Sequence, residues 1–147
     1  MEDVTLREAR PPDFDAILAL WELMEERHTS LPDRREYLEA LHRFAPDLFL
    51  VAEARGKPIG TIVGGWDGWR GHMARLAVSP YLRRSGVARS LVNEAEKRLR
   101  KRGAKRIYAL IDRRNELGKS FWAAAGYTVN DDLVLYTKNI ELDEEPG

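Results

Sequence analysis

The spacing of apolar residues along the chain predicts an alternation of strands and helices. Segments in which apolar residues alternate with polar ones, or follow one another, predict strands. These segments cover residues 4–8, 48–54, 59–65, 72–78 and 105–111. Apolar residues that recur at intervals of three and four predict helices with one buried face. These helices cover residues 11–24, 34–43, 83–102 and 115–125.

The pattern continues to the end of the chain. Residues 127–130 and 133–139 predict a final pair of strands, with Asp131 and Asp132 between them. We therefore expect an α/β (α+β) fold with about four helices. The 147 residues are enough for one domain with one core, which we place at residues 1–140, before an acidic tail at residues 141–147.

Composition argues against several classes of function. The 24 basic and 24 acidic residues give a formal net charge of +0, so no global positive field would attract nucleic acid. The absence of cysteine excludes thiolate nucleophiles and disulfides, and the three histidines lie too far apart to suggest a metal site. The sequence has no signal peptide and no run of about 20 apolar residues, so we expect a cytoplasmic protein without metal or membrane partner.

The most informative segment joins the strand at residues 72–78 to the long helix. It consists of Arg83, Arg84, Ser85, Gly86, Val87 and Ala88. The first turn of a helix presents unpaired N–H groups, and the helix dipole adds positive charge there. Gly86 lets an oxyanion approach the backbone, and Arg83 and Arg84 add full charges. The segment predicts a phosphate or pyrophosphate site, and the alternative is a capped helix with solvated arginines.

The spacing within this segment separates it from other phosphate motifs. The chain contains neither Gly-x-x-x-x-Gly-Lys-Ser/Thr nor Gly-x-Gly-x-x-Gly. Its Arg-x-x-Gly-x-Ala, after a strand that ends Leu-Ala-Val-Ser-Pro, resembles the acetyl-CoA signature of the GNAT superfamily of N-acetyltransferases. The predicted order of elements over residues 4–140 also resembles the GNAT fold, which implies a mixed, mostly antiparallel sheet.

The resemblance implies how the cofactor would bind. In this family the sheet splays apart between its fourth and fifth strands, here residues 72–78 and 105–111, and acetyl-CoA lies in the opening. The pantetheine arm would pair like an added strand with the main chain of Leu76, Ala77 and Val78. The pyrophosphate would lie against residues 83–88.

A second segment resembles the family pattern Asn-x-x-Ala-x-x-apolar-Tyr followed by Gly-Phe. The corresponding residues are Asn115, Gly118, Phe121, Trp122, Gly126 and Tyr127. The resemblance implies cofactor contacts for Asn115, Gly118, Phe121 and Trp122. Trp122 occupies the position of a tyrosine that often protonates the leaving thiolate, and an indole has no proton of useful acidity. Trp122 is therefore either a wall beside the thioester or part of the core.

His72 is the candidate general base. Strand alternation predicts that His72 shares a face with Leu76 and Val78. A neutral imidazole can accept a proton near pH 7, although a lone strand histidine is also compatible with a structural role. Glu53, Asp67 and a water chain are the alternatives.

The loop before this strand is the candidate acceptor site. Trp66, Asp67 and Trp69 lie where the resemblance implies that the acceptor groove begins. Two indoles and a carboxylate suit a cationic amine, and they equally suit a loop anchor or a dimer contact.

These observations predict an enzyme that transfers the acetyl group of acetyl-CoA directly to a primary amine of a small molecule or a protein. One alternative is a non-catalytic acyl-CoA sensor on the same fold, motivated by Trp122. A less favoured alternative is a small nucleic-acid-binding protein that uses the basic side chains of the long helix and the turn before it. These are Arg83, Arg84, Arg98, Arg100, Lys101 and Arg102. A homodimer remains open.

Overall fold

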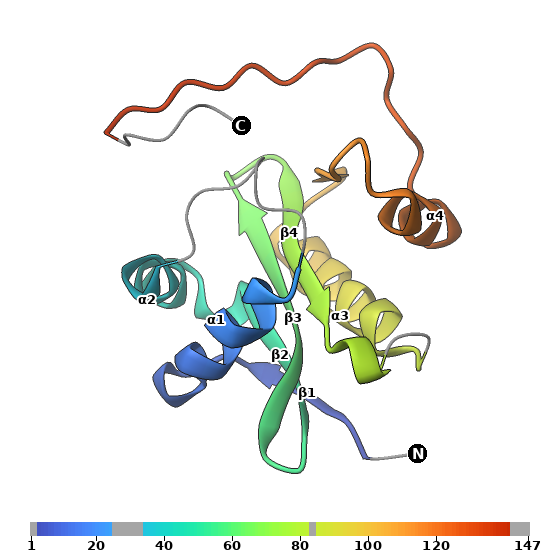
Figure 1. Ribbon diagram of the computed structural model, residues 1–147. Helices are drawn as coiled ribbons and strands as arrows, with labels where there is room; N and C mark the ends of the chain where they lie inside the picture. The colour runs from blue at the N-terminus through green and yellow to red at the C-terminus, as the bar shows by residue number, and fades with distance from the viewer. Residues whose placement is uncertain (1–2, 25–33, 83–84, 142–147) are drawn as a thin grey trace. The chain divides into compact units, whose positions relative to one another are not determined.

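The computed structural model describes residues 3–24, 34–82 and 85–141 (Figure 1). The chain divides into two compact units, of which the first comprises residues 1–24 and 33–110, and the second residues 25–32 and 111–147. The strands of the first unit are β1 (Thr5–Glu8), β2 (Phe49–Ala54), β3 (Lys57–Trp66), β4 (Gly71–Val78) and β5 (Ile107–Ala109). Its helices are α1 (Phe14–Glu22), α2 (Arg35–Phe44) and α3 (Val87–Arg102). Short 3-10 helices cover Pro11–Asp13, Pro46–Leu48 and Pro80–Leu82.

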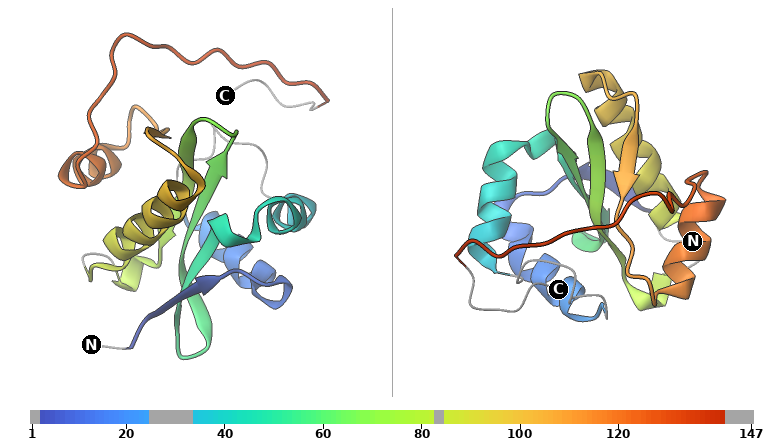
Figure 2. Two further views of the ribbon diagram at one scale, coloured as in Figure 1. Left: turned by 180° about the vertical axis from the view of Figure 1, so that it is seen from behind. Right: turned by 90° about the horizontal axis from the view of Figure 1, so that it is seen from above.

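The five strands form one sheet in the order β1-β2-β3-β4-β5. The first four strands are antiparallel neighbours, and β5 pairs with β4 in parallel. Helices α1 and α2 lie on one face of the sheet and α3 on the other (Figures 1 and 2). The expectation of a mixed, mostly antiparallel sheet with about four helices is confirmed, since α4 (Glu116–Ala124) of the second unit completes the set.

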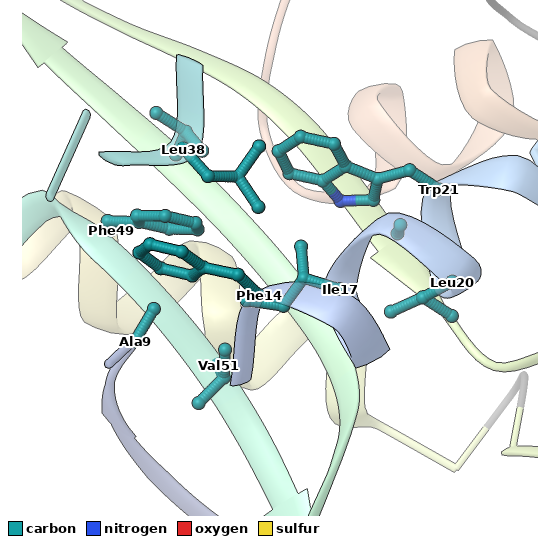
Figure 3. Close-up of a cluster of buried hydrophobic side chains, with 10 residues drawn as sticks. Ala9, Phe14, Ile17, Leu20, Trp21, Leu38, Phe49 and Val51 are labelled. Atoms are coloured by element: carbon teal, nitrogen blue, oxygen red, sulfur yellow. The ribbon is translucent and has the colours of Figure 1, made fainter. Parts of the chain in front are cut away.

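The main core lies between the sheet and α1, because the spacing of apolar residues in α1 places them all on one side (Figure 3). Phe14 stacks on Phe49 of β2, with ring centroids 6.1 Å apart, and Trp21 stacks on the same ring at 6.5 Å. Full burial of such a side chain contributes roughly 1.5–3 kcal/mol. These contacts fix α1 across β2 and β3, beside the strand that carries the candidate site.

Two glycines allow α3 to approach the opposite face closely. A Cβ atom at Gly60 would lie 3.1 Å from Leu91 and 3.3 Å from Val87, and one at Gly71 would lie 3.2 Å from Leu99. Gly60 pairs with the last residue of β4, and Gly71 is its first residue. The two glycines therefore set the first turn of α3 close to the end of β4 and the last turn close to its beginning.

Four predicted elements differ in extent or do not form. The strand expected at residues 105–111 covers only Ile107–Ala109, and α3 begins at Val87 rather than at Arg83, which lies outside the described residues. The strand pair expected at residues 127–130 and 133–139 is wrong, because residues 127–141 form no strand in the structure. Alternating apolar residues make a segment suitable for a sheet, but a strand forms only with a partner. Among the described residues, no helix is long and apolar enough to cross a membrane.

Candidate functional site

The two ends of β4 have different neighbours. Gly71, His72 and Met73 pair with Ile107, Tyr108 and Ala109 of β5, and the pairing stops there. From residue 74 to residue 78, β4 continues along β3 without pairing to β5. We call residues 71–73 the closed end of β4 and residues 74–78 the open end. The resemblance implied this divergence between the fourth and fifth strands.

A β-bulge interrupts β4 where the open end begins. Val63 of β3 pairs with Ala74 and Thr61 with Ala77, so two residues of β4 oppose one residue of β3. One of the two, Arg75, has a φ angle of 54°, in the left-handed region that a side chain disfavours. Such a conformation costs on the order of 1–3 kcal/mol and persists only where its surroundings hold it.

The bulge corrects the predicted face of His72. Pairing places His72 opposite Gly65, on the sheet face that also carries Ala77, whereas Val78 pairs with Gly60 on the α3 face. The extra residue in the bulge reverses the alternation beyond it, so His72 and Val78 do not share a face. The prediction from simple strand alternation is wrong for this reason.

Two buried side chains hold the bulge, and the sequence did not single them out. The indole N–H of Trp21 donates to Thr61 Oγ1 at 2.8 Å, and the Thr61 hydroxyl donates to the carbonyl oxygen of Arg75 at 2.9 Å. The Arg75 guanidinium lies 4.7 Å from the centre of the Trp21 ring. One feature of the sequence could have indicated this network: Thr61 is the polar residue of an otherwise apolar predicted strand, and a buried hydroxyl requires hydrogen-bond partners.

The main chain of the open end presents donors away from β3. The Ser79 N–H donates to Ile59 O at 2.8 Å, so it points toward β3. Because successive N–H groups of a strand point to opposite edges, the N–H of Val78 points toward the edge that β5 leaves free. This arrangement suits an extended ligand that binds as an added strand.

The start of α3 lies after the turn that follows β4. Gly86 is the N-cap, with a φ angle of 89°, and a Cβ atom there would meet nothing within 4 Å. The Ser85 hydroxyl donates to the carbonyl of Leu82, and Ser90 N donates to Gly86 O at 3.0 Å. The first-turn N–H groups of Val87 and Ala88 precede the first helical hydrogen bond. Glycine is therefore favoured at position 86 by the backbone conformation, and no atom of the described residues fills the space around its Cβ position. Arg83 and Arg84 lie outside the described residues.

The closed end of β4 adjoins the candidate acceptor loop. His72 is exposed, and its ring covers the backbone of Gly65, because a Cβ atom there would lie 2.0 Å from His72 Nε2. Trp66 pairs with Gly71 and is half-buried, whereas Trp69 is 74% exposed. The Arg70 guanidinium lies 5.0 Å from the centre of the Trp69 ring.

The two carboxylates considered as alternative bases are engaged in local contacts. Asp67 accepts hydrogen bonds from Arg70 N at 2.6 Å and Trp69 N at 2.8 Å, and these bonds hold its pKa below the usual range. Glu53 accepts a hydrogen bond from Arg7 Nε at 2.8 Å. A lowered pKa makes Asp67 a weak base near pH 7.

In the second unit, Asn115 caps α4. Its side-chain oxygen accepts a hydrogen bond from Gly118 N at 2.9 Å. A Cβ atom at Gly118 would lie 2.2 Å from Asn115 Nδ2, so the side chain of Asn115 occupies the space that an alanine would need. In this position of the Asn115 side chain, only glycine fits at residue 118.

Trp122 is the buried residue of α4. Its ring meets Phe121 edge-on at 5.5 Å between ring centroids and Tyr127 edge-on at 4.8 Å. The Tyr127 N–H donates to the carbonyl of Trp122 at 3.0 Å. Trp122 therefore organises an aromatic cluster within its own unit.

Comparison with known proteins agrees with this arrangement. A sequence profile of the acetyltransferase (GNAT) family matches residues 14–127. Acetyltransferase SG1711 of Sodalis glossinidius is 34% identical over 140 residues, which cover 95% of this chain and 98% of that protein. The crystal structure of Ard1 from Thermoplasma volcanium aligns with a TM-score of 0.78 at 21% identity, over 86% of this chain and 84% of that one.

A further solved structure that resembles this chain is a complex with CoA. The aminoglycoside N-acetyltransferase AAC(6')-Iy in complex with CoA aligns with a TM-score of 0.74 at 16% identity, over 95% of this chain and 97% of that one. The structural likenesses establish the fold, and the sequence profile and the bacterial relative establish the family. The chain is an acyltransferase enzyme that belongs to the acetyltransferase (GNAT) family.

Proposed function

We propose that the protein transfers the acetyl group of acetyl-CoA directly to a primary amine. The observation that carries this proposal is the open end of β4. This part of the strand begins with a bulge, β5 leaves one of its edges unpaired, and the turn that leads to the start of α3 follows it. A free strand edge suits the amide groups of pantetheine, and an uncovered helix start suits a pyrophosphate. The residues present therefore fit the cofactor.

The main chain of the first unit supplies the proposed binding groups. Leu76, Ala77 and Val78 would hold the pantetheine arm, and residues 85–88 would hold the pyrophosphate. Arg83, Arg84 and the α4 residues Asn115, Gly118, Phe121 and Trp122 stay predictions of the sequence. The family match spans residues 14–127, which supports one functional domain at residues 1–140.

Catalysis would depend on position and on polarisation of the thioester. Acetyl-CoA supplies an activated acyl group, so the chain needs to place the amine against it and stabilise the oxyanion. Strand N–H groups at the open end are suitable donors. The chain has no cysteine to form an acyl-cysteine, which favours direct attack by the amine.

We assign the general base to His72. Leu76 lies four positions after His72, which is at most about 13 Å along an extended strand. His72 would therefore accept the proton of the ammonium group through water. Its exposure and its place near the loop of Asp67 and Trp69 support this assignment, whereas Trp66 lies on the opposite face of the sheet, the face that α3 covers.

The acceptor would bind at the same loop. The guanidinium of Arg70 lies over the Trp69 ring, and this contact with a cation supports the proposal. An acceptor amine in its ammonium form has the same charge. Trp69 is thus the proposed contact for the incoming amine.

Contacts within the protein argue against nucleic-acid binding. Arg98 forms ion pairs with Glu94 at 2.9 Å and with Glu8 at 3.2 Å. Arg102 binds both carboxylate oxygens of Asp47, at 2.5 and 3.1 Å. These two arginines of α3 secure the helix to the sheet and to the turn before β2.

A thermal-shift experiment with a matched pair of variants tests the proposal. Acetyl-CoA is expected to raise the melting temperature of the native protein, because a ligand of the folded state stabilises it. Gly86→Glu should abolish the shift by placing bulk and negative charge at the helix start. Gly56→Glu is the control, since Gly56 also has a positive φ angle, 77°, and open space around its Cβ position.

The outcomes separate the alternatives. Loss of the shift in both variants, or in neither, would contradict the assignment of the pyrophosphate site. A panel of amines, with release of CoA measured, then tests transfer. Binding of acetyl-CoA without release of CoA for any amine would favour the sensor.

A further inference from the structure

We infer that Thr61 is a positioning residue for the thioester site, and that Trp21 aligns it. The Thr61 hydroxyl would turn the N–H of Leu76 toward the open end of β4, where it can donate to the thioester carbonyl. The inference rests on the proposed acetyl transfer, and it concerns two buried side chains that do not themselves contact the reacting atoms.

The first step is the geometry of one peptide group. The carbonyl of Arg75 and the N–H of Leu76 belong to the same planar peptide unit, and no peptide bond in the described chain is cis. In a trans peptide the C=O and the N–H point in opposite directions. The Arg75 carbonyl points to Thr61 in β3, at 2.9 Å. The Leu76 N–H therefore points away from Thr61, and the alternation that places the N–H of Val78 on the edge that β5 leaves free places the N–H of Leu76, two residues earlier, on the same edge.

The second step is the direction of the hydroxyl proton. An indole N–H is only a donor, and a hydroxyl has a single proton. Because Trp21 Nε1 donates to Thr61 Oγ1 at 2.8 Å, the hydroxyl is the acceptor in that bond. Its proton is free for the Arg75 carbonyl. Trp21 thus fixes the direction of both hydrogen bonds, from the indole to the hydroxyl and from the hydroxyl to the carbonyl.

The third step is the backbone conformation that the chain maintains. Arg75 has a φ angle of 54°, and Thr61 and Trp21 are 0% and 2% exposed. The Arg75 side chain also lies over the Trp21 ring, at 4.7 Å. The Trp21 indole therefore holds Arg75 in two ways. It contacts the Arg75 side chain directly, and it contacts the Arg75 carbonyl through Thr61. Strained backbone held by a buried polar network suggests a functional requirement at that place.

The test compares three variants with the native enzyme in steady-state acetyl transfer. Thr61→Val keeps the shape and removes the hydroxyl, and we expect kcat to fall by about tenfold, the effect of a barrier increase of about 1.4 kcal/mol. We expect KM for acetyl-CoA to change by less than about threefold, since the other main-chain contacts remain. Thr61→Ser should restore kcat to within about twofold. Trp21→Phe, which keeps the threonine but frees its hydroxyl, should show an intermediate loss of kcat.

Ile17→Val controls for a general loss of stability. Ile17 lies in the same buried cluster and contributes no polar atom to the network. We expect this variant to lower the melting temperature and keep kcat. If Thr61→Val fails to fold, the comparison of Thr61→Ser and Trp21→Phe with Ile17→Val decides the question in the same way.

A second measurement does not require turnover. The amide resonance of Leu76 should shift more on addition of acetyl-CoA than of CoA, and Thr61→Val should remove the difference. Native kcat with an unchanged Leu76 response in Thr61→Val and Trp21→Phe would overturn the inference while the proposed function stands. An intact Leu76 response in a protein that acetylates no amine would overturn the proposed function alone.

Discussion

The closed and open ends of β4 are parts of one eight-residue strand, yet they have opposite characters. At the closed end, the main chain is paired on both sides and the side chain of His72 is exposed. At the open end, Ala77 and Val78 are buried, and the main chain has a free edge beyond the β5 pairing. One end thus offers a side chain to a ligand, and the other offers backbone.

This difference suggests a division of labour along the strand. Backbone donors recognise groups that are common to every reaction of a family, such as the amides of a cofactor, and they do not depend on side-chain identity. Exposed side chains suit the group that differs from one enzyme to the next, here the acceptor amine. The bulge at Arg75 lies at the boundary and allows one strand to serve both purposes.

The largest expected effect follows from the loss of the side chain at the closed end. In the native enzyme, kcat/KM should rise with pH, because a general base accepts a proton only in its deprotonated form. His72→Ala should lower the rate by about 100-fold and flatten this rise. The measurement is the dependence of kcat/KM on pH for both proteins.

His72→Gln serves as the control, because it keeps a polar side chain over Gly65 but cannot act as a base near neutral pH. It should match His72→Ala in rate. Either variant with the native rate and pH profile would show that the closed end supplies no base, and water would then take the proton.

A matched pair of glycine substitutions tests the open end. Gly60→Val and Gly71→Val both introduce side chains under α3, the first against Val87 and Leu91 and the second against Leu99. Overpacking of this kind costs typically about 1–3 kcal/mol of stability, so both variants should unfold at lower temperature. Only Gly60→Val displaces the first turn of α3. It should weaken acetyl-CoA binding by about tenfold, which titration calorimetry can measure.

The difference in acetyl-CoA affinity between Gly60→Val and Gly71→Val decides the test. Gly71→Val should bind acetyl-CoA within about twofold of the native affinity, since it disturbs the other end of the helix. Equal loss of affinity in the two variants would mean that binding responds to stability in general, and the division between the two ends would not hold.

The sequence predicted the features that depend on local signals. The end of the long helix at residue 102 was predicted, and Gly103 directly after it adopts a positive φ angle that other residues cannot easily take. The start of this helix was predicted four residues too early, at residue 83 instead of Val87. The start of α4 was also predicted to within one residue, and there the Asn115 side chain forms a short-range cap hydrogen bond, which was not predicted. The resemblance to the family added the divergence of β4 and β5, which local pattern alone does not reveal.

The features that the sequence did not predict depend on pairing between distant segments. The bulge at Arg75 arises from the register of β3 against β4, and it reversed the predicted face of His72. The Trp21–Thr61 contact joins residues 40 positions apart. Residues 127–141 have the alternation of strands but no strand in the structure, because alternation does not supply a partner.

The smallest expected effect concerns the leaving group, and it tests how much the open end achieves alone. If main-chain donors at this end stabilise the oxyanion, departure of the thiolate needs little help. The thiol of CoA should resemble that of cysteine, whose pKa is about 8.5, so the thiolate is a moderate leaving group near neutral pH. Trp122→Tyr introduces a phenol where the family often has one, and we expect the rate to rise by no more than about tenfold, about 1.4 kcal/mol of barrier.

Trp122→Phe is the matched control, because it reduces the ring without adding a hydroxyl, and Trp122→Ala measures the structural role. The ring of Trp122 packs edge-on against Phe121 and Tyr127, so its removal should cost about 3–5 kcal/mol of stability as well as activity. Steady-state rates and melting temperatures of the three variants separate these effects. A rise of several hundredfold in Trp122→Tyr, absent in Trp122→Phe, would show that acid catalysis limits the native protein. The backbone donors of the open end would then be insufficient, and the native chain would act mainly as a binder of acetyl-CoA.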